Sequence, residues 1–177
     1  MNKMKLKSTK ISLFLLLFLS NIVFTYSQLF NVFISNSTNV SCFGGNDGSA
    51  ESTPVGGISP YSYNWLPSGG NSNIANNLTA GVYTVVVTDA NMVTASSSVT
   101  ITQPTVLNCI ITNYTPPTST ISNDGSATVT AFGGSPSYTY NWSPSGGTGI
   151  TANNLSSGNY FVTVTDSKGC TTHVLLS

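Results

Sequence analysis

The amino-acid sequence predicts an all-β protein built from two tandem sandwich modules. Short runs rich in Val, Thr, Tyr and Ser alternate with clusters of Gly, Pro and Asn, a pattern typical of strands and turns. Beyond Ser27, no apolar stripe recurs at the helical period. The stretch N-D-G-S-A…G-G…Y-S-Y-N-W that begins at Asn46 returns as N-D-G-S-A…G-G…Y-T-Y-N-W at Asn123. A repeat of this kind indicates an array of like modules.

Residues 1–27 predict a cleaved secretory signal peptide. Four lysines precede an apolar run over 11–19, and Thr25-Tyr26-Ser27 places small residues before Gln28. The alternative is an uncleaved anchor helix, but the run is short for a membrane span and is followed by Asn21. The repeat then divides the remaining chain into modules at 28–104 and 105–177, each of roughly 75 residues, which is small for a self-sufficient core.

The charge of the processed chain excludes several classes of partner. Signal cleavage leaves Lys168 as the only basic residue beside five acidic ones, a formal net charge of −4. Nucleic-acid affinity and attraction to anionic membranes both depend on Lys and Arg, so we expect no nucleic-acid partner. The processed chain also offers no segment for direct insertion into a membrane.

The strands of each module are predicted from period-two alternation between turn clusters. In the first module they fall near residues 38–42, 48–54, 61–66, 74–78, 81–88 and 93–102. In the second they fall near residues 106–113, 125–132, 138–143, 150–155, 159–165 and 170–176. Prolines at 104 and at 116–117 flank the first strand of the second module and predict a semi-rigid link.

Three aromatic residues recur at period two in each copy. Tyr61, Tyr63 and Trp65 share one face of a strand, and their counterparts are Tyr138, Tyr140 and Trp142. One interpretation is an exposed aromatic platform for sugar rings. The favoured interpretation is a core strand with the Trp between two sheets, because a module this small has few other large residues to bury.

The segments L-x-x-G-x-Y at 78–83 and 155–160 predict an immunoglobulin-like sandwich. The arrangement is similar to the tyrosine corner of that fold, in which the Tyr83 or Tyr160 hydroxyl bonds a nearby backbone group.

Together these motifs resemble the SprB repeat. The matching strings are C-F-G-G-N-D-G-S-A from Cys42, then G-G-x-x-P-Y-x-Y-N-W, then L-x-x-G-x-Y-x-V-x-V-T-D. The resemblance covers nearly the whole processed chain and implies extracellular immunoglobulin-like modules of the kind that build large bacterial surface adhesins. It implies no particular ligand. The family's long adhesins continue through many repeats, so a fragment of a longer adhesin is one expectation for a chain that stops at Ser177.

The resemblance also bears on the three cysteines. In the family, a cysteine near the start of a repeat is often matched by one after the T-D-x-x-G turn. Here the position that would pair with Cys42 holds Val93, and the position that would pair with Cys170 holds Ser119. We therefore expect a Cys109–Cys170 disulfide within the second module and an unpaired Cys42.

No constellation of residues predicts catalysis. His173 is the only histidine and Glu51 the only glutamate, and neither recurs in the other copy. Asp47, Asp89, Asp124 and Asp166 do recur at equal positions, and calcium prefers such oxygens. The favoured interpretation is turn chemistry, because each module offers too few carboxylates for a full site.

The predicted function is therefore adhesion or spacing by a secreted or cell-surface repeat protein that is not an enzyme and has no cofactor. Surface glycans or other cell-surface proteins are the candidate partners, contacted through polar strand faces and the loops 67–73 and 144–150. The alternative is a non-catalytic carbohydrate-binding module of a secreted polysaccharide-processing system, which exposed Tyr61 or Trp65 would favour. A calcium-dependent module is a third, weaker candidate.

Overall fold

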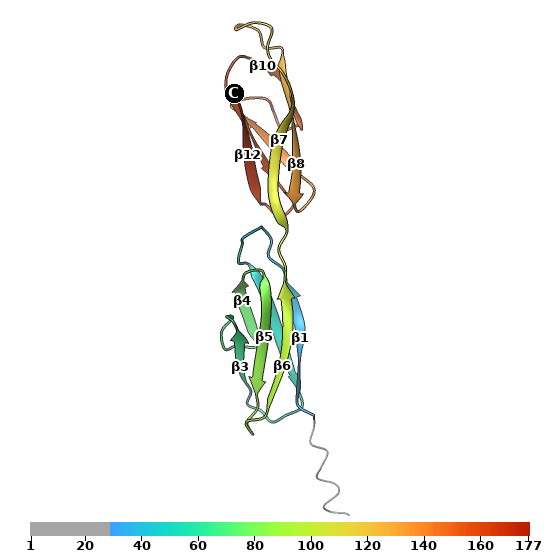
Figure 1. Ribbon diagram of the computed structural model, residues 1–177, viewed down its shortest axis with the longest axis vertical. Coiled ribbons are helices and arrows are strands. Elements are labelled where there is room, and N and C mark those ends of the chain that lie inside the picture. The colour runs from blue at the N-terminus through green and yellow to red at the C-terminus, as the bar shows by residue number, and fades with distance from the viewer. Residues whose placement is uncertain (1–28) are drawn as a thin grey trace, which may run out of the picture.

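The computed structural model describes residues 29–177 as two β-sandwiches stacked end to end (Figure 1). The predicted signal peptide lies outside the described residues. All twelve regular elements are strands, and the part of the chain described includes no helix able to cross a membrane. The prediction of an all-β, immunoglobulin-like tandem is confirmed.

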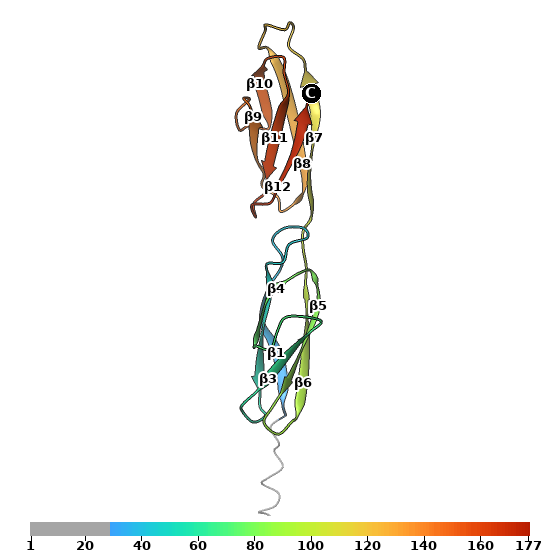
Figure 2. The ribbon, with the colours of Figure 1, turned by 90° about the vertical axis from the view of Figure 1, so that its left-hand side faces the viewer.

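Module one consists of two three-stranded antiparallel sheets packed face to face. The first sheet has the order β1-β2-β4 and the second the order β3-β5-β6. β1 also packs against β6, which closes one side of the sandwich (Figure 2). The strands are β1 (Asn31–Thr38), β2 (Gly48–Val55), β3 (Ser62–Leu66), β4 (Ile74–Leu78), β5 (Gly81–Thr88) and β6 (Thr94–Ile101).

Module two repeats this arrangement with sheets β10-β8-β7 and β12-β11-β9. β7 packs against β12, as β1 does against β6. Only the three residues of Thr102–Pro104 separate β6 from β7, so the modules lie close together. The strands are β7 (Thr105–Thr115), β8 (Gly125–Gly134), β9 (Thr139–Ser143), β10 (Thr151–Leu155), β11 (Tyr160–Thr165) and β12 (Thr171–Leu176).

The prediction was wrong for the first strand. We expected it at 38–42, but β1 occupies Asn31–Thr38 and residues 39–47 form a loop. The apolar residue Val40, which suggested a strand, lies instead in this loop. Its side chain is only 4% exposed and covers the end of the core. Its N–H donates to the carbonyl of Thr102 rather than to a neighbouring strand.

The core interpretation of the aromatic strand is confirmed. Trp65 and Trp142 are exposed by only 2% and 4%, whereas Tyr61 and Tyr138 are half-buried and pack against the two cores. Each Tyr hydroxyl donates to a glycine carbonyl at 2.7 Å, that of Gly56 just after β2 or that of Gly133 near the end of β8. These rings therefore close the sandwich instead of forming a platform.

The tyrosine corners are also present. The Tyr83 hydroxyl donates to the Thr79 carbonyl at 3.2 Å, and the Tyr160 hydroxyl accepts from the Ser156 N–H at 3.2 Å. Both rings are buried, so each corner fastens the β4–β5 or β10–β11 connection onto the core.

We expect Trp65→Ala to remove about 3–5 kcal/mol from the stability of module one, because it deletes the largest buried side chain and leaves a cavity. The Trp65 Nε1–H bond to the Ser72 carbonyl is lost as well. The matched control is Leu66→Ala on the same strand, which is 48% exposed and should change stability by about 0.5 kcal/mol or less. Calorimetric unfolding of both variants decides the point, and similar effects would contradict the assigned core.

Candidate functional site

The most distinctive site is the junction between the modules. The loop 39–47, here called the junction loop, wraps around the linker Thr102–Pro104. The Thr102 N–H donates to the Asn39 side-chain carbonyl at 2.9 Å, and the Gly44 N–H donates to the Gln103 side-chain carbonyl at 2.8 Å. With the Val40–Thr102 bond, these contacts fix the linker against module one.

A disulfide crosses the junction. Cys42 in the junction loop is bonded to Cys170 in the β11–β12 turn of module two, with a Cα–Cα distance of 5.7 Å and a sequence separation of 128. Both cysteines are half-buried. The predicted Cys109–Cys170 pairing is therefore wrong, and Cys42 is not the unpaired cysteine.

The geometry of the sandwich also rules out the family's pairing scheme within one module. The loop after β1 lies at the end of module one that faces module two, and the turn between β5 and β6 lies at the opposite end (Figure 1). A strand of eight residues separates the two ends by about 26 Å, far beyond the reach of a disulfide. The two half-positions of the scheme can meet only between neighbouring modules.

Cys109 is the free cysteine. It lies in the middle of β7, half-buried against the core of module two and beside Thr172. Burial raises the pKa of its thiol, with the hydrogen bond to Thr172 acting in the opposite direction.

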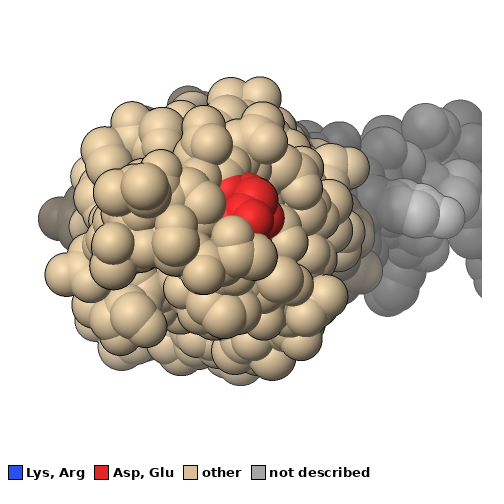
Figure 3. All heavy atoms as spheres, turned by 90° about the horizontal axis from the view of Figure 1, so that it is seen from above, with Lys and Arg blue, Asp and Glu red and all other residues tan. Residues whose placement is uncertain are grey.

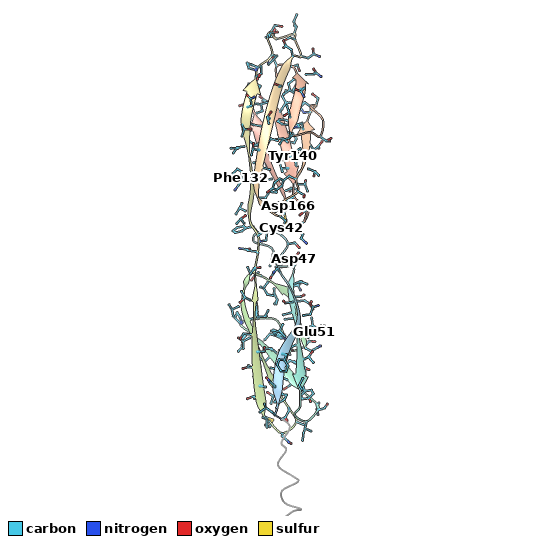
Figure 4. The ribbon with its side chains drawn as sticks, turned by 90° about the vertical axis from the view of Figure 1, so that its right-hand side faces the viewer. Cys42, Asp47, Glu51, Phe132, Tyr140 and Asp166 are labelled. Carbon is cyan, nitrogen blue, oxygen red and sulfur yellow. A yellow bond between two sulfur atoms is a disulfide. The ribbon has the colours of Figure 1, made fainter. Side chains whose placement is uncertain are left out.

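An aspartate positions each half of the cross-link (Figure 4). Asp166 is 5% exposed, and its Oδ1 accepts from the Lys168 and Cys170 N–H groups while Oδ2 accepts from the Ser135 N–H. Asp47 Oδ1 accepts from the Ser41 N–H, next to Cys42. Both cysteines are thus presented by turns that a carboxylate holds in shape.

These contacts lower the pKa of each carboxyl. Burial opposes ionisation of Asp166, but the N–H donors outweigh it, and its pKa lies below the usual 3.8. The side-chain and backbone hydrogen bonds from Ser41 lower the pKa of Asp47, with a small contribution from the positive charge of Lys168. Lys168 is the single basic residue among 29–177, and it belongs to the turn of module two that carries Cys170.

Gly134 lets Asp166 approach the loop that follows β8. Its φ is +58°, and a Cβ at this position would lie 2.6 Å from Asp166 Oδ2. The requirement for glycine follows directly, because the carboxylate occupies the place of a side chain.

Asp89 and Asp124 form the same contacts at the ends of the modules away from the junction. Asp89 accepts from the Asn91, Val93 and Ile58 N–H groups, and Asp124 accepts from the Thr118 N–H and hydroxyl. The Thr118 hydroxyl and N–H lower the pKa of Asp124 to about 2. Among residues 29–177, no three His, Cys, Asp or Glu side chains group together as metal ligands would. The four predicted calcium candidates therefore serve as backbone acceptors in turns.

The predicted binding loops fold back onto the core. The Trp65 Nε1–H donates to the Ser72 carbonyl in loop 67–73, and the Trp142 Nε1–H donates to the Gly149 carbonyl in loop 144–150. Each loop is thereby shaped around the edge of its own Trp, and its polar outer side stays exposed.

The outer face of module two carries a surface groove that the sequence did not single out. Phe161, Thr163, His173 and Leu175 line a groove of about 440 Å³ on β11 and β12. Phe161 and Leu175 are cross-strand partners with 45% and 59% exposure. In module one the aligned pair is Thr84 and Ser98, so the apolar groove belongs to one module only. The sequence did contain a signal for this groove, because the period-two alternation along the strand places Phe161 on the outward face.

A second hollow of about 380 Å³ lies at the junction, lined in part by Phe43, Val106 and Leu107. Glu51 is half-exposed on β2, away from both hollows.

Figure 3 views the far end of module two and shows one acidic group among uncharged residues, with no basic residue on that face. Strong charge is therefore absent from the face in view.

The fold and the junction define an immunoglobulin-like tandem whose modules are joined by both a short linker and a disulfide. The SprB repeat model matches residues 34–70 and 112–149, and the chain thus carries two SprB repeats. A search of curated proteins finds no match.

Among solved structures, the chain is similar to three N-terminal domains of the bacteriophage RB49 highly immunogenic outer capsid protein. The identity is 20%, the TM-score is 0.51, and the match covers 82% of this chain and 57% of that one. A C-terminal intimin fragment, solved with the intimin-binding domain of Tir, matches at 15% identity and a TM-score of 0.40, over 82% and 62% of the two chains. The chain thus spans less than two thirds of each structure. The first likeness supports the fold.

We expect the disulfide to be Cys42–Cys170 in the secreted protein. Non-reducing peptide mapping by mass spectrometry, after digestion with pepsin at low pH to prevent exchange, should yield one cross-linked pair containing these residues. Alkylation without reductant should modify Cys109 alone, and slowly, because burial raises the pKa of its thiol. Recovery of a Cys109–Cys170 peptide would contradict the structure.

We expect Asp166→Asn to lower the melting temperature of module two by several degrees and to make the disulfide reduce several-fold faster. An Asn amide would direct N–H groups toward one set of backbone donors. The matched control is Asp89→Asn, which removes the same contacts in module one far from the junction and should leave the reduction rate unchanged.

The pH dependence has a defined sign. Because the folded pKa of Asp166 lies below its unfolded value, the stabilisation is complete above about pH 3.8 and is lost as the pH falls through the folded pKa. Asp166→Asn should flatten this acid loss of stability in module two.

In the reduction experiment, equal reduction rates in the Asp166→Asn and Asp89→Asn variants would show that Asp166 does not position Cys170.

Proposed function

We propose that this chain is an extracellular or cell-surface repeat protein that works as a rigid spacer in adhesion or display, and not as an enzyme. The observation that carries the proposal is the junction, where three linker residues, a wrapped loop and a disulfide hold two sandwiches end to end. A flexible pair of domains would need none of these. The SprB repeats are consistent with this role.

The disulfide also supports the location. Structural disulfides persist outside the cytoplasm, where thiols are not kept reduced. A bond that joins residues 128 positions apart, across two separately packed modules, has to survive in the environment where the protein acts. This agrees with the predicted signal peptide.

The carbohydrate-binding alternative loses its main support, because Trp65 and Trp142 are buried and Tyr61 packs against the core. The groove of Phe161, Thr163, His173 and Leu175 favours a second candidate function, in which module two also binds a ligand on the outer face of β11 and β12. Its exposed aromatic ring, imidazole and neighbouring hydroxyl suit a glycan or a protein surface.

Both functions can be tested in the native cell with an epitope inserted at 119–122, where Ile121 is 96% exposed. A surface spacer predicts that antibody labels intact cells. Labelling only after lysis would contradict the proposal.

The Phe161→Thr/Leu175→Ser variant separates the two functions, since it installs the residues found at the aligned positions of module one. A pure spacer predicts unchanged cell attachment at equal surface display. A ligand-binding module two predicts at least a several-fold loss of attachment. The matched control is Val82→Thr, an exposed apolar residue on β5 of module one, which should leave attachment unchanged.

A further inference from the structure

We propose that the Cys42–Cys170 disulfide makes the pair of modules a covalent strut, in which tension passes along β1, through the disulfide and along β12 while both sandwiches stay folded. The inference concerns mechanics, goes beyond the proposed spacer role, and holds for any load applied before Cys42 and after Cys170.

The covalent path follows from the connectivity. A load from the N-terminal side reaches Cys42 through β1, and at Cys42 the chain divides into two routes to Cys170. One route runs through every strand from β2 to β11, and the other is the single disulfide. The short route becomes taut first, so tension cannot pull residues 43–169 out into an extended chain.

The direction of the strands makes this path nearly straight. β1 runs toward the junction and ends just before the junction loop, and β12 starts at the junction and runs away from it (Figure 1). Cys42 and Cys170 meet between them. The load therefore acts along the axes of two strands that are already extended.

Tension does work only over the distance that the path can lengthen. β1 and β12 are extended strands, so the available slack is mainly the turn of Asn39–Cys42. If residues 29–42 and 170–177, roughly 22 residues, were fully released from their sheets, their extended length would be at most about 80 Å. β1 and β12 are also paired along their lengths with β2 and β11, which resists even this release.

Without the disulfide the same load would follow the whole chain. It would enter module one at the start of β1 and leave at the end of β6, and then cross module two from β7 to β12. Both sandwiches would stand in series in the path and could unfold. The full extension of residues 29–177, roughly 149 residues, is about 540 Å.

Single-molecule force spectroscopy of the full secreted chain, held by handles fused to its two ends, tests the proposal. In oxidising buffer we expect no extension step longer than about 80 Å, the limit set by the residues outside the disulfide loop. In the same molecules after reduction, we expect two further unfolding steps, one for each module. Release of the full chain length under oxidising conditions would overturn the proposal.

Three variants complete the experiment. Cys109→Ser keeps the cross-link and should behave as the wild type does, before and after reduction. Cys42→Ser and Cys170→Ser should each show both module-unfolding steps without reductant. Because reduction of the wild type needs no substitution, the test survives if a variant fails to fold, and calorimetry of the reduced protein verifies that both modules remain folded before pulling.

The outcome is independent of the proposed spacer role. A protein that labels only lysed cells but shows the short extension would retain the strut and lose the surface function. A surface protein with full-length extension would show the reverse.

Discussion

The double connection at the junction is the constraint on which the arrangement of this molecule depends. The peptide linker alone would leave two small sandwiches free to bend about Thr102–Pro104. The disulfide adds a second connection on a different loop, and two separated connections restrict most of the bending about the linker. In the chain-entropy description a closed loop of 128 residues disfavours the unfolded state by about 5 kcal/mol. Each module keeps its own core, so the larger consequence is orientation.

The two repeats share their backbone devices and differ where they meet. Every module end carries an aspartate that closes a turn through backbone N–H groups, at 47, 89, 124 and 166. Only the two ends that face each other add a cysteine to that turn. The other ends have Val93 and Ser119 at the aligned positions. A common turn has thus been adapted for a covalent joint by one substitution on each side.

Much of the fold could be predicted because the signals are local. The period-two aromatics located the core strands, and the L-x-x-G-x-Y segments located the corners, since both depend on neighbours within a few residues. Val40 misled because an apolar residue that plugs a sandwich end looks the same in sequence as one in a strand. The Asp89 bond to the Ile58 N–H spans 31 residues and carries no local pattern.

The junction could not be predicted for a different reason. The repeat pattern describes one module at a time, so the partner of Cys170 was expected within its own module, at Cys109. The true pairing depends on which ends of the sandwich the β1–β2 loop and the β11–β12 turn occupy, and on how the next module is stacked. That information resides in topology and in the three-residue linker, not in the spacing of Cys42, Cys109 and Cys170.

The same topology limits how far the covalent strut can extend. A further module stacked beyond the β7–β8 loop would meet Ser119 where module one presents Cys42, and a module before β1 would meet Val93 where module two presents Cys170. Neither end can form this cross-link, whatever chain lies next to it. This cross-link is therefore confined to the pair, and any contact at the tip, where Ile121 is almost fully exposed, has to rely on non-covalent packing. The pair is thus the proposed rigid unit, and bending in any larger assembly would concentrate at its two ends.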